Sequence, residues 1–156
     1  MALKIEHRLG VQAPADVIWP ILSDLPSWAE WNPLYPAARG EIHIGERLTL
    51  DVAVPGQAVR TIQPRILDWA PNDHIHWRLV LMRGLITSTR YLEIEIMGET
   101  SCIVSNGELF TGPLSFLVRS QRRAIRQGFD AMGEAIKTRA EAVWAAQQGL
   151  SSPPSP

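Results

Sequence analysis

The feature that most limits the possible folds is a change of hydrophobic period at Thr111-Gly112-Pro113. Before this point, from Ala38 to Phe110, apolar and polar residues alternate between turn residues, which is typical of antiparallel strands. After it, apolar residues recur at the spacing of an amphipathic helix for about thirty residues. The predicted apolar face of this helix comprises Val118, Ile125, Phe129, Met132, Ile136, Ala140 and Val143. We therefore predict an α+β fold in which one long C-terminal helix packs on a sheet.

The first part of the chain predicts one strand and then two short helices. Alternation over residues 3–11 indicates a half-buried strand. A helical pattern covers residues 14–22, and Asp24 is a candidate cap for a second helix that ends at Asn32-Pro33. With the later strands this gives a curved antiparallel sheet of about seven strands around the helix. Because a curved sheet cannot touch a long helix along its full length, we expect a cavity between them, where proteins commonly bind small molecules.

The last two predicted strands form a hairpin whose register follows from its turn. If Gly98-Glu99-Thr100 connects the two strands, residues at equal distances from Glu99 face each other. The predicted pairs are Ile96 with Cys102, Ile94 with Val104, Leu92 with Asn106, and Arg90 with Glu108. The apolar residues on this face, which include Ile86, should turn it toward the helix. Arg90 and Glu108 are then predicted to form an ion pair at the edge of the cavity, with the pKa of Glu108 lowered by the arginine.

Composition bounds the kind of protein. The chain has 156 residues and a formal net charge of −1, which argues against a nucleic-acid binder. Its single cysteine, Cys102, excludes an intrachain disulfide and any zinc site with several thiolates. We expect no membrane-spanning segment, no signal peptide in residues 1–10 and a cytoplasmic location. One domain is expected over residues 1–148, followed by a disordered Ser/Pro tail over residues 149–156.

Three stretches of the chain resemble a known family. The first, residues 13–33, combines a proline-started helix with a Trp31-Asn32-Pro33 corner. The second covers residues 62–77, and the third covers residues 107–114. They are similar to the START-like or SRPBCC superfamily, and in particular to its bacterial polyketide cyclase/dehydrase-type branch. The resemblance implies the helix-grip fold, in which a curved sheet wraps one long C-terminal helix.

The resemblance leaves three functions open, because the superfamily includes lipid and sterol carriers, aromatic cyclases, hormone receptors and co-chaperones. The chain could bind a small hydrophobic or aromatic molecule, such as a lipid or a polyketide. It could be a cofactor-free enzyme of the cyclase/dehydratase type, with Arg90, Glu108 and His7 as candidate catalytic residues. It could also be a co-chaperone-like module for protein interaction. The candidate ligand-binding residues are Trp31, Tyr35, Trp77, Arg90, Leu92, Glu108, Phe110, Ile125, Phe129 and Met132.

The Arg90–Glu108 pair has alternative interpretations too. It could orient a ligand carbonyl or carboxylate, act as a proton donor and acceptor, or serve as a structural ion pair. His7, between Ile5 and Leu9, is more typical of a core or edge histidine than of a catalytic base. The sequence has no nucleophile elbow, phosphate-binding glycine loop, dinucleotide fingerprint or His-Glu-x-x-His motif, so we expect no cofactor.

Two further groups of residues carry weaker signals. His74 and His76 share a strand face, but no carboxylate or thiolate lies at a matching spacing, so we expect no metal site. Four arginines gather on one flank of the long helix, which is typical of a solvated face. The alternatives are an anion-steering rim and a contact surface for an acidic or lipid partner. These residues are Arg119, Arg122, Arg123 and Arg126. A homodimer is left open.

Overall fold

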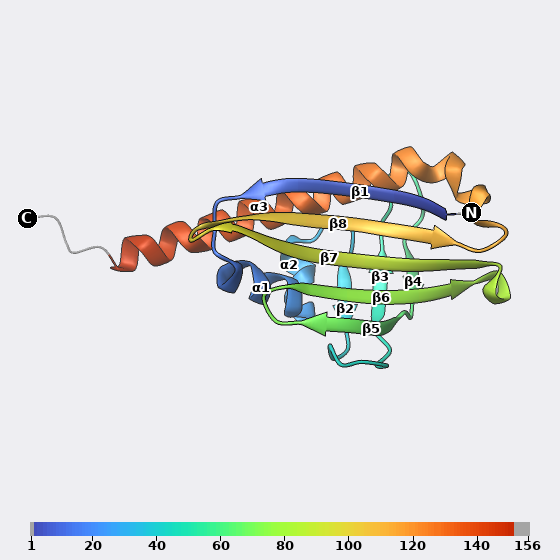
Figure 1. The fold of residues 1–156 in the computed structure, drawn as a ribbon, viewed down its shortest axis with the longest axis horizontal. Helices are drawn as coiled ribbons and strands as arrows, with labels where there is room; N and C mark the ends of the chain where they lie inside the picture. The colour runs from blue at the N-terminus through green and yellow to red at the C-terminus, as the bar shows by residue number, and fades with distance from the viewer. Residues whose placement is uncertain (1, 152–156) are drawn as a thin grey trace, which may run out of the picture.

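The computed structural model describes residues 2–151, which form a large curved sheet, a small sheet and a long helix (Figure 1). The strands are β1 (Ala2–Val11), β2 (Ala37–Arg39), β3 (Thr49–Val52), β4 (Arg60–Ile62), β5 (Arg65–Ala70), β6 (His74–Leu81), β7 (Ile86–Gly98) and β8 (Ser101–Thr111). The α-helices are α1 (Ala15–Ser23), α2 (Trp28–Trp31) and α3 (Arg122–Ser151), and the 3₁₀ helices are η1 (Leu25–Ser27), η2 (Met82–Gly84) and η3 (Ser115–Gln121). The predicted α+β class and order of elements are confirmed.

The strands of residues 2–151 divide between two antiparallel sheets. The large sheet has the order β1-β8-β7-β6-β5, and the small sheet has the order β2-β3-β4. Eight strands in two sheets thus replace the predicted single sheet of about seven. Pro64, between β4 and β5, has no N–H to donate, which favours a break in the ladder there. Its carbonyl accepts a hydrogen bond from the Leu48 N–H at 2.8 Å, which helps to join the two sheets.

The predicted register of the β7–β8 hairpin is confirmed at all four pairs, including Arg90 with Glu108. The predicted inward face is also correct for Ile86, Leu92 and Ile94, which are buried. Ile96 is an exception, because it is 64% exposed. The register shifts between Ile96 and Gly98, and such a bulge disturbs the alternation of faces at the end of the strand.

The C-terminal helical segment begins with η3 and continues as α3, which lies across one face of the large sheet (Figure 1). Five predicted apolar-face residues are buried, namely Ile125, Phe129, Met132, Ile136 and Ala140. Val143 is 36% exposed, and the C-terminal part of α3 extends past the sheet. The helix continues to Ser151, beyond the predicted start of the tail, and residues 152–156 lie outside the described part of the chain. No helix within residues 2–151 is long and apolar enough to cross a membrane.

Candidate functional site

A cavity of about 390 Å³ lies between the two sheets and the N-terminal part of α3. Strands β3, β4, β6, β7 and β8 contribute to its walls, together with η2 and η3. Much of the lining is apolar and includes the rings of Trp77, Phe110 and Phe129. Its polar residues are Tyr35, Arg60, Ser88, Arg90, Glu108 and Gln121. The cavity predicted between the sheet and the C-terminal helix is therefore present.

Arg90 is buried and bonded to its surroundings on every side of the guanidinium. Its Nε donates to the Tyr35 hydroxyl at 2.9 Å, and its Nη1 donates to the Gly107 carbonyl at 2.9 Å and the Tyr91 carbonyl at 3.1 Å. The guanidinium also lies 4.1 Å from the centroid of the Phe129 ring, in cation–π contact. These contacts hold the Arg90 side chain in one place and leave it few donors for a ligand.

Glu108 lies opposite Arg90 in the ladder, but the predicted ion pair is absent from the part of the chain that the structure describes. Its carboxylate instead accepts a very short hydrogen bond from the Ser88 hydroxyl. Burial raises the pKa of Glu108 above its ordinary value, although Arg90 and the Ser88 hydrogen bond act in the opposite direction. The predicted lowering of the pKa of Glu108 is therefore wrong, because desolvation outweighs the attraction between the two charges.

Tyr35 owes its position to the Asn32 corner of the sequence. The buried Asn32 side chain accepts hydrogen bonds from the backbone N–H groups of Leu34 and Tyr35, both at 3.0 Å. Such an Asx turn reverses the chain after α2 and directs it toward β2. The Tyr35 ring then lies against Trp77, with ring centroids 6.1 Å apart, and burial raises the pKa of its hydroxyl. The family-like corner thus positions one wall of the cavity.

The structure brings together most, but not all, of the candidate ligand-binding residues. Those that line the cavity are Tyr35, Trp77, Arg90, Glu108, Phe110, Ile125 and Phe129. Leu92 and Met132 are completely buried elsewhere in the core. The Arg90 guanidinium lies 3.6 Å from the Met132 sulfur, so it occupies the space between Met132 and the cavity. Trp31 lines a separate shallow groove beside α3.

His7, the third candidate catalytic residue, lies outside the cavity lining. Its ring packs against Gly133 of α3, where an added Cβ would come within 2.7 Å of Nδ1. The Nε2 atom is 3.6 Å from Asp130. His7 therefore belongs to the contact between β1 and α3, because both residues that it meets, Gly133 and Asp130, lie on α3.

Three polar residues of the cavity were not among the sequence candidates. Ser88 shares a face with Arg90 by simple alternation, so the hairpin pattern contained a signal for it. Arg60 and Gln121 come from β4 and η3, and no periodicity places those elements beside the cavity. The predicted arginine flank is exposed at Arg122, Arg123 and Arg126, and its role stays a prediction.

A comparison with known protein families identifies the family of this chain. A family model described as polyketide cyclase / dehydrase and lipid transport matches residues 2–141. The chain belongs to this family. This membership confirms the polyketide cyclase/dehydrase-type resemblance of the sequence. No curated protein gives a significant match.

Solved structures show that the family's helix-grip fold extends along nearly the whole chain. An aromatase/cyclase from a Streptomyces species aligns with a TM-score of 0.75 at 20% identity, covering 94% of this chain and 98% of that one. A START superfamily protein from Mycobacterium smegmatis gives 0.70 at 19% identity, over 90% and 98%. Norcoclaurine synthase from Thalictrum flavum gives 0.70 at 17% identity, over 92% and 96%. These similarities establish the fold and leave the activity open.

Proposed function

We propose that the protein binds a small hydrophobic or aromatic molecule in the cavity and that Glu108 contacts an oxygen atom of that molecule. The observation that carries the proposal is a carboxyl group with a raised pKa on the wall of a largely apolar cavity. Burial favours the neutral carboxyl, which donates a hydrogen bond that a carbonyl or hydroxyl oxygen can accept. The description of the family, which includes lipid transport, supports the same class of ligand.

The test of binding uses a residue on the cavity wall and a matched one on the same helical segment. Val118→Trp fills the cavity from η3, whereas Val143→Trp adds the same bulk to an exposed position of α3. We expect the wild type and the Val143 variant to bind anilinonaphthalene sulfonate, with a rise in fluorescence. The Val118 variant should bind it about tenfold more weakly or worse, a loss of about 1.4 kcal/mol. Equal affinities of all three proteins would contradict binding in the cavity.

The natural ligand can be sought directly. Native mass spectrometry of the protein purified from its own host should show the chain with an added mass, and Val118→Trp should remove that mass. If the wild type and the variant carry the same added mass, the molecule is bound elsewhere. The cavity supports this proposal over the co-chaperone-like alternative, because a protein-interaction module has no need of a hollow core.

A cyclase/dehydratase activity is the second candidate, and the environment of Glu108 favours it. A carboxyl with a raised pKa is suited to general acid catalysis near neutral pH. In a dehydration, Glu108 would protonate the departing hydroxyl, which leaves as water, and its carboxylate would then take a proton from the adjacent carbon. Arg90 would act as a positioning residue through Tyr35 and Phe129. Two of the similar structures are an aromatase/cyclase and norcoclaurine synthase, which supports the assignment as an enzyme.

The second candidate is tested with an aryl β-hydroxy ketone, whose dehydration gives an enone that absorbs in the near ultraviolet. Glu108→Gln should slow this reaction by about 100-fold or more while the affinity for the substrate stays within about twofold. A wild type that binds the ketone without forming the enone would exclude this dehydration and leave the binding proposal intact.

A further inference from the structure

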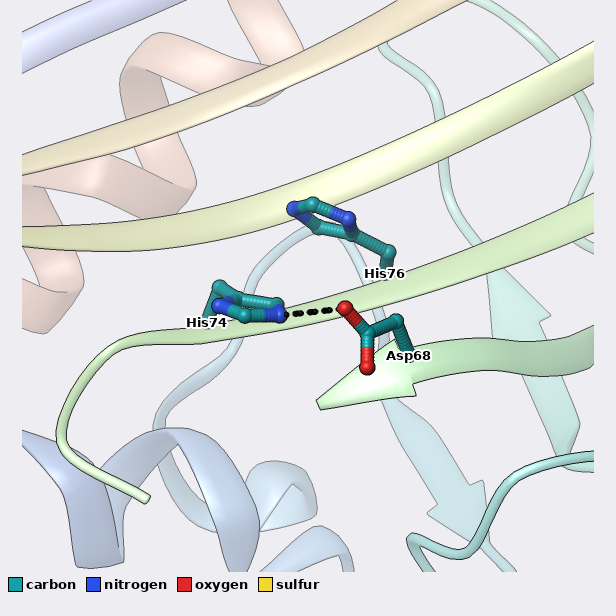
Figure 2. Close-up of side chains that lie close together, drawn as sticks. All are labelled: Asp68, His74 and His76. Atoms are coloured by element: carbon teal, nitrogen blue, oxygen red, sulfur yellow. Dashed lines mark hydrogen bonds and ion pairs between the residues drawn. The ribbon is translucent and has the colours of Figure 1, made fainter. Parts of the chain in front are cut away.

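Three side chains able to bind a metal ion lie together on the outer face of the large sheet. They are Asp68 on β5 and His74 and His76 on β6, and Figure 2 shows them projecting from neighbouring strands. One ligand atom from each lies within 4.8 Å of the others. Because His76 stands between Ile75 and Trp77, which are buried on the inner face, the cluster and the cavity are on opposite sides of the sheet.

A β-bulge explains how Asp68 reaches this face. Ile66 is buried and pairs with Trp77, so strict alternation would also turn Asp68 inward. The register shifts between Ile66 and Asp68, which adds one residue to β5 and places Asp68 opposite His76. Bulges often reorient a side chain that has a function. The sequence pattern alone gives no sign of this third ligand.

The contacts of the two histidines orient them as metal ligands. The Nε2 atom of His74 is 2.9 Å from Asp68 Oδ2, and its Nδ1 atom is 3.4 Å from an Asp73 oxygen. A carboxylate on one ring nitrogen is the usual outer partner of a metal-bound histidine, because it leaves the other nitrogen free for the ion. The His76 ring lies 4.5 Å from the His74 ring, and its Nε2 is 3.1 Å from Glu93 Oε2.

We propose that Asp68, His74 and His76 bind one Zn²⁺ ion, with Glu93 supplying a fourth ligand from β7. Two imidazoles with carboxylates suit zinc and its neighbours in the first transition series, whereas Mg²⁺ and Ca²⁺ prefer oxygen ligands alone. The ion takes the place of the proton between His74 and Asp68. Ligand atoms of a tetrahedral zinc ion are roughly 3.4 Å apart, so the widest separation among Asp68, His74 and His76 must contract by about 1.4 Å, within reach of side-chain rotation. Glu93 lies outside this group, 3.1 Å from His76 Nε2, and its side chain must rotate further to complete the site.

A zinc ion bound at this site would link the edge strand β5 to its neighbour β6. Strand β5 is the last strand of the large sheet and pairs on one side with β6. An ion held by ligands from both strands fixes the bulged register between them. Zinc binding should therefore raise the melting temperature of the protein without any change in the cavity.

The first test is isothermal titration of the metal-free, untagged protein with zinc chloride. We expect one ion per chain, and Asp68→Asn, His74→Gln and His76→Gln should each weaken binding by about tenfold or more. His43→Gln is the matched control, because His43 is exposed and also lies near a carboxylate, at 3.6 Å from Glu41. Absence of binding, or variants at Asp68, His74 and His76 that bind as the control does, would overturn the proposal.

A second measurement identifies the ligands without any substitution. The sequence has four histidines, His7, His43, His74 and His76, so their imidazole signals can be followed individually by NMR. Zinc should shift the signals of His74 and His76 and leave those of His7 and His43 in place. A shift confined to His43, or spread equally over all four, would show that zinc binds elsewhere. The affinity for anilinonaphthalene sulfonate should stay constant in the same titration, which keeps this result separate from that of the cavity.

Discussion

At the scale of single residues, Arg90 and Glu108 show how burial changes what a charged side chain can do. Both lie on the same face of the β7–β8 hairpin and both line the cavity. Arg90 is 2% exposed and satisfies its donors with Tyr35 and with backbone carbonyls. Glu108 has the Ser88 hydroxyl as its hydrogen-bond partner. The arginine is therefore committed to structure, and the glutamic acid is the group available for chemistry.

Arg90→Met should destabilise the protein by about 3 kcal/mol or more. The methionine fills much of the same space, but it leaves the Gly107 carbonyl and the Tyr35 hydroxyl without their buried partner, at about 1–3 kcal/mol each. Urea denaturation measures the change in the free energy of unfolding. Arg122→Met on the exposed surface of α3 is the control and should change it by less than about 0.5 kcal/mol. A loss of similar size in both variants would contradict this account of Arg90.

Glu108→Gln should stabilise the protein at neutral pH but not at acidic pH. Because the folded-state pKa of Glu108 is raised, its protonated form stabilises the fold fully below the ordinary value of 4.5, and that contribution is lost as pH rises through the raised pKa. Glutamine cannot ionise and keeps the hydrogen bond to Ser88. The melting temperature of the variant should exceed that of the wild type by a few degrees at pH 8 and match it at about pH 4. Parallel curves for the two proteins would show that burial does not raise this pKa.

At the scale of elements, the packing of β8 between β1 and β7 depends on Gly107. The Tyr91 ring of β7 lies directly over Gly107, and its hydroxyl donates a very short hydrogen bond to Glu6 on β1. Burial, and then the contact with the Glu6 carboxylate, raise the pKa of the Tyr91 hydroxyl. Because Gly107 has no side chain, the Tyr91 ring passes over β8 and links β7 to β1. Covering a glycine with an aromatic ring is a known way to support it in a sheet.

Gly107→Ala should cost about 1–3 kcal/mol, because the new methyl group would overlap the Tyr91 ring and displace it from Glu6. Gly10→Ala on β1 is the control, since nothing lies within 4 Å of its added methyl group. Thermal unfolding followed by circular dichroism compares the two variants. If Gly107→Ala and Gly10→Ala have the same melting temperature, the Tyr91 ring moves aside without cost, and the prediction is wrong.

The secondary-structure elements could be predicted from the sequence more completely than the site could. The β7–β8 register followed from a short turn and local alternation, and the buried face of α3 followed from its period. The raised pKa of Glu108 could not be deduced, because it depends on how far the cavity excludes water. Arg60 reaches the same cavity from a second sheet, and the bulge before Asp68 reverses a face that alternation predicts. Local patterns thus predict the elements, whereas the site depends on contacts between distant segments.

At the scale of the whole molecule, the cavity lies between a large sheet and a small sheet that consists of short strands. Strands β2, β3 and β4 have three or four residues each, whereas β7 and β8 have 13 and 11. Short strands open locally at lower free-energy cost than the long central pair. Anilinonaphthalene sulfonate should therefore slow amide hydrogen exchange in β3 and β4, which line the cavity, and leave β1 unchanged. Hydrogen exchange with mass spectrometry measures this, and equal protection of β1 and β3 would contradict it.

The pairing of β1 with β8 has a consequence for how the chain acquires this structure. The first strand pairs along its whole length with the last one, from Ala2 opposite Thr111 to Val11 opposite Cys102. During synthesis on the ribosome, β1 has no partner until β8 (Ser101–Thr111) has been made, and α3 cannot cover the sheet until later still. Contacts between such distant segments slow folding, because a long loop must close first. The nascent chain therefore carries an amphipathic strand without its partner through most of its translation, and the side chains of Ile5 and Val11 stay exposed until β8 pairs with it.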